Sequence, residues 1–96
     1  SRLIQLTFKH KNPELVNRCA HLFARELRKQ WPTKILGPQS PAVARIQQLF
    51  LRTILIKSGK GNELKQIRNK IFEVQLKMKQ DKTFRPVIIQ ADVDPM

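Results

Sequence analysis

Few residues of this chain have the types and spacings that could perform chemistry. Asp92 and Asp94 stand two positions apart in a terminal DVDP, and on a strand that spacing would place both carboxylates on one face. A cation site needs more oxygen ligands than these two, and no further carboxylate or histidine stands near them in the sequence. His10 and His21 have no His or Cys partner at ligand spacing. The sequence therefore predicts no metal site and no cofactor in this domain.

The sequence also offers no nucleophile and no nucleotide site. Cys19 is the single cysteine, and its apolar neighbours favour a buried structural thiol in a reducing compartment. The chain has no P-loop, no dinucleotide-binding glycine motif and no nucleophile elbow, and the GKG at 59–61 is too short to cradle phosphates. We expect a binding module with no catalytic residue and no ATP hydrolysis.

The charge of the chain points to a polyanionic partner. Lys and Arg number 19 against 7 Asp and Glu, which gives a formal charge of +12 and a pI near 10.8. One basic group is a stripe on a predicted helix, and such a stripe is typical of a solvated helix face. It consists of Arg18, Arg25, Arg28 and Lys29.

The other basic residues surround glycine-containing connections, where a bare backbone can approach a phosphate closely. Aromatic residues make up only 6% of the chain, so base stacking is not expected to be the main mode of binding. The sequence predicts contacts to the phosphate backbone of a nucleic acid instead. The predicted nucleic-acid-binding residues are Lys34, Arg45, Arg52, Lys57 and Lys60.

Apolar periodicity divides the chain into six elements. Ile4, Leu6 and Phe8 alternate with polar residues, as in a half-buried strand. Asn12-Pro13 is a helix start, and Gly37-Pro38 is expected to stop a strand. In chain order the pattern predicts strand 2–9, helix 12–30, strand 33–36, strand 46–57, helix 62–79 and strand 87–91.

This order predicts an α+β ferredoxin-like β-α-β-β-α-β fold, with a four-stranded antiparallel sheet and two helices on one face. The other face is expected to be open. Residues 1–96 form one domain, because no linker or internal repeat interrupts them. The predicted core contains Phe8, Phe23, Ile54, Ile67, Ile71 and Ile89.

Three local patterns together resemble the C-terminal domain of PriA-type primosomal helicases. They are RLIQLTFKHKNPE at 2–14, ILGP followed by PAVARI across 35–46, and DVDP at 92–95. The resemblance covers almost the whole chain. It implies a fold like that of a small-subunit ribosomal protein. It also implies a parent ATP-dependent helicase that restarts stalled forks, of which this chain, opening without Met, is expected to be a fragment.

The resemblance also implies partners and a compartment. The partners are forked or branched DNA with single-strand to double-strand junctions, and the helicase core of the same polypeptide. Single-stranded-DNA-binding protein and other primosome proteins are further partners that it implies. The compartment is the bacterial cytoplasm, and no membrane is expected, because no apolar run approaches the ~20 residues of a span.

One departure from the family affects a predicted site residue. The family commonly has aromatic-Arg-aromatic where this chain reads Phe50-Leu51-Arg52, so the arginine is displaced by one position. A one-residue shift on a strand changes the face. Arg52 is therefore expected in line with Ile54, on the core side, where it reaches water only from the end of the strand.

Three functions remain open at this point. The first is a DNA-binding module of a replication-restart helicase. The second is an RNA-binding or ribosome-associated protein of the same fold, for which the charge is equally suitable. The third is a docking domain for the helicase core or other primosome proteins that never touches DNA.

Overall fold

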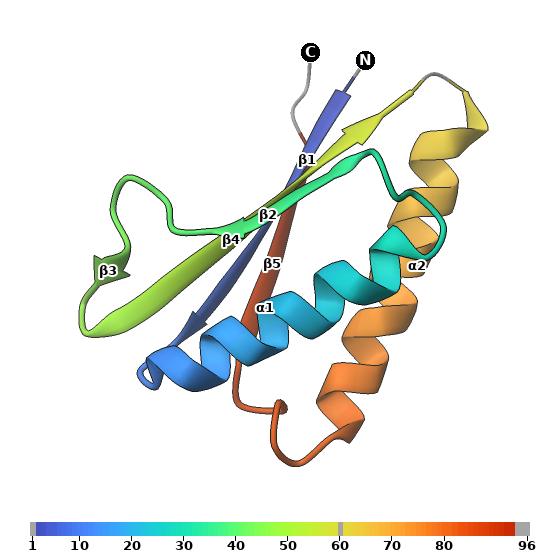
Figure 1. Ribbon diagram of the computed structural model, residues 1–96. Coiled ribbons are helices and arrows are strands. Elements are labelled where there is room, and N and C mark those ends of the chain that lie inside the picture. The colour runs from blue at the N-terminus through green and yellow to red at the C-terminus, as the bar shows by residue number, and fades with distance from the viewer. Residues whose placement is uncertain (1, 60, 94–96) are drawn as a thin grey trace.

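The alternating residues at the start of the chain form β1 (Arg2–His10), a central strand of the sheet. The computed structural model describes residues 2–59 and 61–93. The elements that follow are α1 (Pro13–Arg28), β2 (Ile35–Gln39), β3 (Arg45–Ile46), β4 (Leu49–Ser58), α2 (Asn62–Gln80) and β5 (Ile88–Val93). The strands are antiparallel in the order β2-β4-β1-β5, and β3 pairs with β4. Both helices lie on the same face of the sheet (Figure 1).

This architecture agrees with the predicted fold class in most respects. The α+β class, the antiparallel sheet and the two helices on one face are confirmed. The expected four strands were one too few, because the two-residue β3 makes a fifth. The fold is therefore broadly ferredoxin-like with an added hairpin between β2 and β4.

The start of α1 follows from the residues that precede it. The Asn12 side chain accepts hydrogen bonds from the backbone N–H groups of Glu14 (3.0 Å) and Leu15 (3.3 Å). These bonds satisfy two amides that have no partner inside the helix. Pro13 occupies the first turn, where a missing N–H costs nothing. The helix is thus fixed directly at the end of β1.

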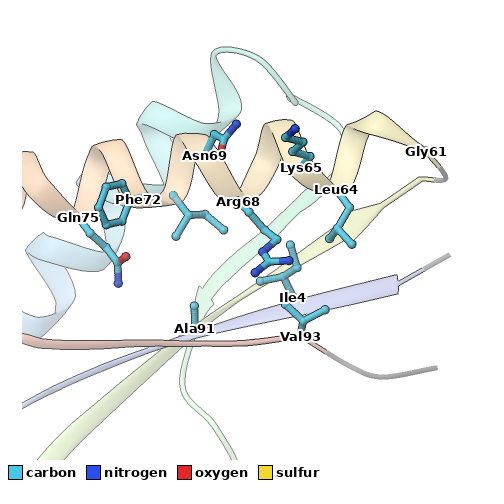
Figure 2. Close-up of a pocket in the computed structure, with 11 residues that line it drawn as sticks. Ile4, Gly61, Leu64, Lys65, Arg68, Asn69, Phe72, Gln75, Ala91 and Val93 are labelled. Atoms are coloured by element: carbon cyan, nitrogen blue, oxygen red, sulfur yellow. The ribbon is translucent and has the colours of Figure 1, made fainter.

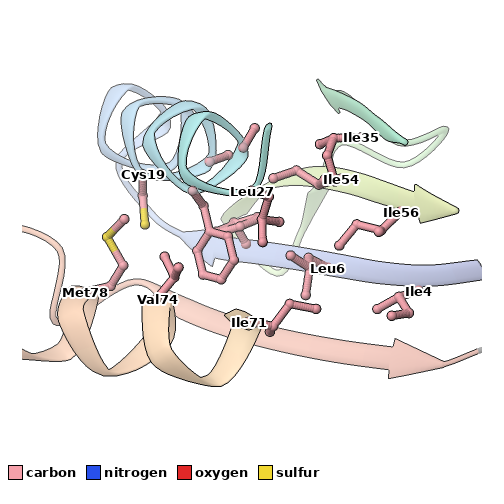
Figure 3. Packing of buried hydrophobic residues seen from close by; sticks show 14 of the residues in the cluster. Ile4, Leu6, Cys19, Leu27, Ile35, Ile54, Ile56, Ile71, Val74 and Met78 are labelled. Carbon is pink, nitrogen blue, oxygen red and sulfur yellow. The ribbon is translucent and has the colours of Figure 1, made fainter. Parts of the chain in front are cut away.

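The core lies between the helices and the sheet. Ile4, Leu6 and Phe8 of β1 are fully buried toward the helices, and the Phe8 ring meets Phe23 of α1 edge to face at 5.4 Å. Figure 3 shows Leu6 and Ile54 of the sheet in one packed set with Leu27 of α1 and Val74 and Met78 of α2. The apolar set is continuous across both helices.

Five of the six predicted core residues are buried, and the sixth is not. Phe8, Phe23, Ile54, Ile67 and Ile71 belong to the core cluster, whereas Ile89 is only half-buried against it. Ile89 lies on β5, an edge strand that pairs with β1 alone. Ile89 faces the core side opposite Phe8 but is less buried than predicted, because α2 packs mainly on α1 and β4 and leaves β5 partly uncovered.

The predicted stop at Gly37-Pro38 was also wrong, because β2 runs through both residues. Gly37 has a φ of +104°, and a Cβ there would lie 2.8 Å from the Thr53 backbone oxygen. Pro38 is tolerated because β2 is an edge strand, where a missing N–H need not break a ladder. An Arg28 Nη2 donor bonds the carbonyl oxygens of Ile35 and Gly37. Arg28, expected on a solvated stripe, therefore fastens β2 to α1.

The predicted strand 46–57 is two strands. A two-residue turn at Gln47 and Gln48 separates β3 from β4, with Ile46 opposite Leu49. Both turn residues have positive φ, at 50° and 68°. Tight hairpin turns of this kind favour Asn-Gly or Gly-Gly, so Gln-Gln gave no turn signal. The end of the last strand also differs from the prediction, because β5 continues past residue 91 to Val93.

Candidate nucleic-acid interface

Two predicted site residues meet at the end of the sheet where β1 stops and β4 begins. Arg45 of β3 lies directly opposite Phe50, and its guanidinium carbon is 5.3 Å from the centre of that ring. Arg52 lies opposite Phe8, on the side of the sheet that carries the helices. The register thus confirms that Arg52 faces the core side. Arg52 is half-buried, and its Nη1 donates to the Leu51 carbonyl at 2.8 Å.

Two others lie at the opposite end of the sheet. Lys57 is exposed and stands opposite Leu3 on the open face. Its backbone N–H donates to the Lys34 carbonyl at 3.0 Å, so the two lysines are neighbours. The Lys34 ammonium bonds the Glu63 carboxylate. Lys60 lies outside the described residues.

The five predicted residues therefore do not form one track along the protein. Arg52 and Lys57 are five residues apart on β4, about 17 Å at the rise of an extended strand, and they face opposite sides. The set divides into Arg45 and Arg52 at one end, and Lys34 and Lys57 at the other. The role of each in binding stays a prediction.

The first end carries further basic residues that the sequence reasoning did not select. Lys9 and His10 are the last residues of β1, and Lys11 follows in the exposed turn. His10 lies opposite Phe50, so His10 on β1 and Arg45 on β3 flank Phe50 from the two sides of β4. We call Lys9, His10, Lys11, Arg45 and Arg52 the hairpin-end cluster. The KHK at 9–11, where the first predicted strand ends, was the available signal, but only the strand register joins it to residues 45–52.

The helix stripe has mainly structural contacts. The Arg18 guanidinium lies over the Phe84 ring, 5.7 Å from its centre. Lys29 pairs with Glu26 at 2.8 Å, and the side-chain hydrogen bond from Lys29 lowers the pKa of Glu26. With Arg28 bonded to β2, two of the four stripe residues contact other parts of this domain, and Lys29 pairs with a residue of its own helix. This supports the expectation that the stripe is not the binding site.

The end of the sheet that carries Lys34 and Lys57, which we call the turn end, is held by one carboxylate. Glu63 accepts from the Lys34 ammonium and from the Gly59 backbone N–H at 2.6 Å. The hydrogen bond from Lys34, followed by that from Gly59, holds the pKa of Glu63 below its ordinary value. The ionised carboxylate ties the start of α2 to the connection before β2.

A groove of about 720 Å³ lies between α2 and β5 (Figure 2). Ile4, Ala91 and Val93 line it from the sheet, and Arg68 points from α2 toward them. Phe72 is 63% exposed beside this groove. Phe72 falls outside the three-and-four spacing of the buried α2 residues, and that irregularity is the sequence signal for the groove.

Two further residues whose types could perform chemistry, Cys19 and Asp92, lie within the described residues. Burial raises the pKa of the Cys19 thiol to about 12, with a smaller effect from the Asp81 charge, so this thiol stays protonated at neutral pH. Asp92 lies on β5 opposite Gln5, and Asp94 falls outside the described residues. Within residues 2–59 and 61–93, no three His, Cys, Asp or Glu side chains gather where they could hold a metal ion. In the same residues, no helix is long and apolar enough to cross a membrane.

The fold and the cation positions define a small basic α+β domain, with helices on one face of an antiparallel sheet and a cationic sheet end. The family model of the primosomal protein N C-terminal domain matches residues 1–96, so the chain belongs to that family. The resemblance to PriA-type helicases is therefore confirmed. Membership supports a role in the replication-restart primosome.

Comparison with solved structures gives the fold independently. The chain is similar to "De novo designed protein Foldit4", with a TM-score of 0.66 and 8% sequence identity over 99% of this chain and 97% of that one. At this identity the likeness shows the fold alone. A search of curated proteins found no match.

Proposed function

We propose that this domain binds the phosphate backbone of forked or branched DNA through the hairpin-end cluster, as a non-catalytic module of a replication-restart helicase. The observation that carries the proposal is that four cations and a histidine from β1, the turn after it, β3 and β4 lie at one end of the sheet. His10, Arg45 and Arg52 are on the helix side, and Lys9 is on the open side. Adjacent strands lie about 4.8 Å apart, so three strands present these groups across a width of about 10 Å.

The local electrostatics support this proposal. No acidic residue occurs between Glu26 and Glu63, a segment that includes β2, β3 and β4. Lys9, Lys11, Arg45 and Arg52 therefore contribute a formal +4 with little opposing charge from the hairpin itself. Affinity for DNA arises largely from Lys and Arg that displace counterions from phosphates, and a concentrated positive field also steers encounter.

The turn end has a different role in the proposal. Lys34 is engaged with Glu63, and its contribution is to hold the start of α2 in place. Lys57 is exposed on the open face and, with the predicted Lys60, supplies a second and weaker contact to a DNA arm. Phosphate contacts position a protein without reading bases, so no sequence preference is expected.

Chemical-shift mapping tests this function. Uniformly ¹⁵N-labelled chain is titrated with a short DNA fork, and backbone amide shifts are followed. We expect the largest changes at residues 9–11 and 45–52, and small changes at 77–82. An absence of changes with DNA, or equal changes throughout the surface, would contradict the proposal. A fork of RNA serves as the matched comparison, and a stronger response to it would favour the RNA-binding alternative.

A second candidate function is docking to the helicase core of the same polypeptide. The observation that favours it is the α2–β5 groove, where an exposed Phe72 and the cationic Arg68 stand beside an apolar floor. An apolar patch bordered by charge is typical of a protein contact. The same labelled chain titrated with the separate helicase core should then respond at Leu64 to Gln75 and not at the hairpin.

A further inference from the structure

The β3–β4 hairpin combines a costly turn with an ordered surface stack. Gln47 and Gln48 both adopt positive φ, which side chains other than Gly and Asn disfavour. Observed strain of this kind concentrates at functional positions. The turn sets Ile46 opposite Leu49 and Arg45 opposite Phe50, and the Leu51 N–H donates to Ala44 at 2.8 Å. The strained turn therefore fixes the register that brings Arg45 onto Phe50.

The stack presents one free side. Phe50 is half-buried and lies between Arg45 and His10 in adjacent strands, whereas Arg45 is exposed. The guanidinium carbon lies 5.3 Å from the ring centre, and the Arg45 side chain is exposed to solvent. A guanidinium attracted to a ring has less freedom to move, and its plane is one on which a flat partner can stack.

Within the hairpin itself, the residues beside Arg45 and Phe50 are apolar or amide side chains. Ile46 is 49% exposed and Val43 is 57% exposed, and both flank the stack in sequence. The hairpin extends away from both helices (Figure 1). A surface that joins an aliphatic patch, two amide side chains and a stacked guanidinium, without any acid, fits a nucleobase better than it fits a second protein's charged surface.

We propose that Arg45, supported by Phe50, stacks on an unpaired base at a DNA junction. This inference rests on the proposed function, because it specifies which part of forked DNA the hairpin meets. In a duplex the base faces are occupied by their neighbours, so only an unpaired nucleotide can offer a free plane. Arg45 then contributes a flat contact to a base in addition to its charge.

A conservative variant distinguishes the contribution of the planar Arg45 guanidinium from that of its positive charge. Arg45→Lys keeps the cation and removes the planar group, and Arg25→Lys at an exposed position on α1 is the matched control. Binding is measured with a fork whose single-stranded arm carries 2-aminopurine beside the junction, and with a blunt duplex. We expect Arg45→Lys to weaken fork binding about five-fold or more and to remove the fluorescence change, since one stacked base contributes at least that much. Duplex binding and the control should remain unchanged.

Two results would overturn the inference. One is equal fork binding and fluorescence change by Arg45→Lys and the unmutated chain. The other is an equal loss on fork and duplex, which would mean that the guanidinium contacts the phosphate backbone and not an unpaired base. Phe50→Leu, checked for folding by circular dichroism, should reproduce the effect of Arg45→Lys. Failure of the unmutated chain to bind any DNA would instead overturn the proposed function together with the inference.

Discussion

At the scale of single residues, a few positions have their identity fixed by local geometry. Gly37 combines a φ of +104° with a close approach to the Thr53 backbone, while Gly61 has a φ of +73° and open space around it. Alanine substitutions at the two glycines can therefore distinguish the cost of the backbone conformation from the cost of steric overlap.

Alanine at these two positions should have unequal costs. Gly61→Ala adds only an unfavourable conformation, about 1–3 kcal/mol. Gly37→Ala adds a similar conformational cost and a contact of 2.8 Å with a backbone atom that cannot rotate away, which contributes about 1–3 kcal/mol more. Urea denaturation of both variants measures the difference. Equal losses of stability would show that the approach to Thr53 does not constrain β2.

Glu63 gives the stability a defined pH dependence. Its folded pKa lies below the ordinary value because Lys34 and then Gly59 donate to the carboxylate. Its contribution is therefore full above the unfolded pKa of about 4.3 and is lost as the pH falls through the folded pKa. Glu63→Gln should lower the midpoint of thermal unfolding at pH 7, and the difference from the unmutated chain should shrink at pH 3. A difference that is the same at both pH values would contradict this account.

At the scale of elements, the β3–β4 hairpin is the part that the sequence did not reveal. Helix starts are local, so Asn12-Pro13 and the spacing of α2 were sufficient to predict both helices. The turn at Gln47-Gln48 has no residue that favours positive φ, and its conformation is imposed by pairing of the flanking strands. Gly37-Pro38 misled for the converse reason, because an edge strand accepts residues that usually break one.

Replacing the turn residues by better turn formers should stabilise the hairpin. Gln47→Asn combined with Gln48→Gly supplies the pair preferred in two-residue turns and should raise the free energy of unfolding by about 1 kcal/mol. The register, and with it the Arg45–Phe50 stack, should be retained. Denaturant unfolding of the double variant checks this expectation. A lower free energy of unfolding would mean that the glutamine side chains themselves hold the hairpin.

At the scale of the whole molecule, charge and composition predicted the partner class better than the site. The net charge of +12 is a property of the sequence, whereas the gathering of Lys9, Lys11, Arg45 and Arg52 depends on which strands are neighbours. The same dependence places Arg52 and Lys57, both predicted to bind nucleic acid, at opposite ends of the sheet and on opposite faces. Residues distant in the chain can be assigned to one surface only after the register is known.

The salt dependence of DNA binding tests the central claim most directly. The triple variant Lys9→Ala, Lys11→Ala and Arg45→Ala is compared with Lys77→Ala, Lys79→Ala and Lys82→Ala, three exposed lysines at and just after the end of α2. Both triples remove the same charge. The slope of log binding constant against log salt concentration for forked DNA should fall by up to about three for the first triple, because each lost phosphate contact removes about 0.9. The second triple should change this slope little, and equal changes in the two would contradict a phosphate site at the hairpin end.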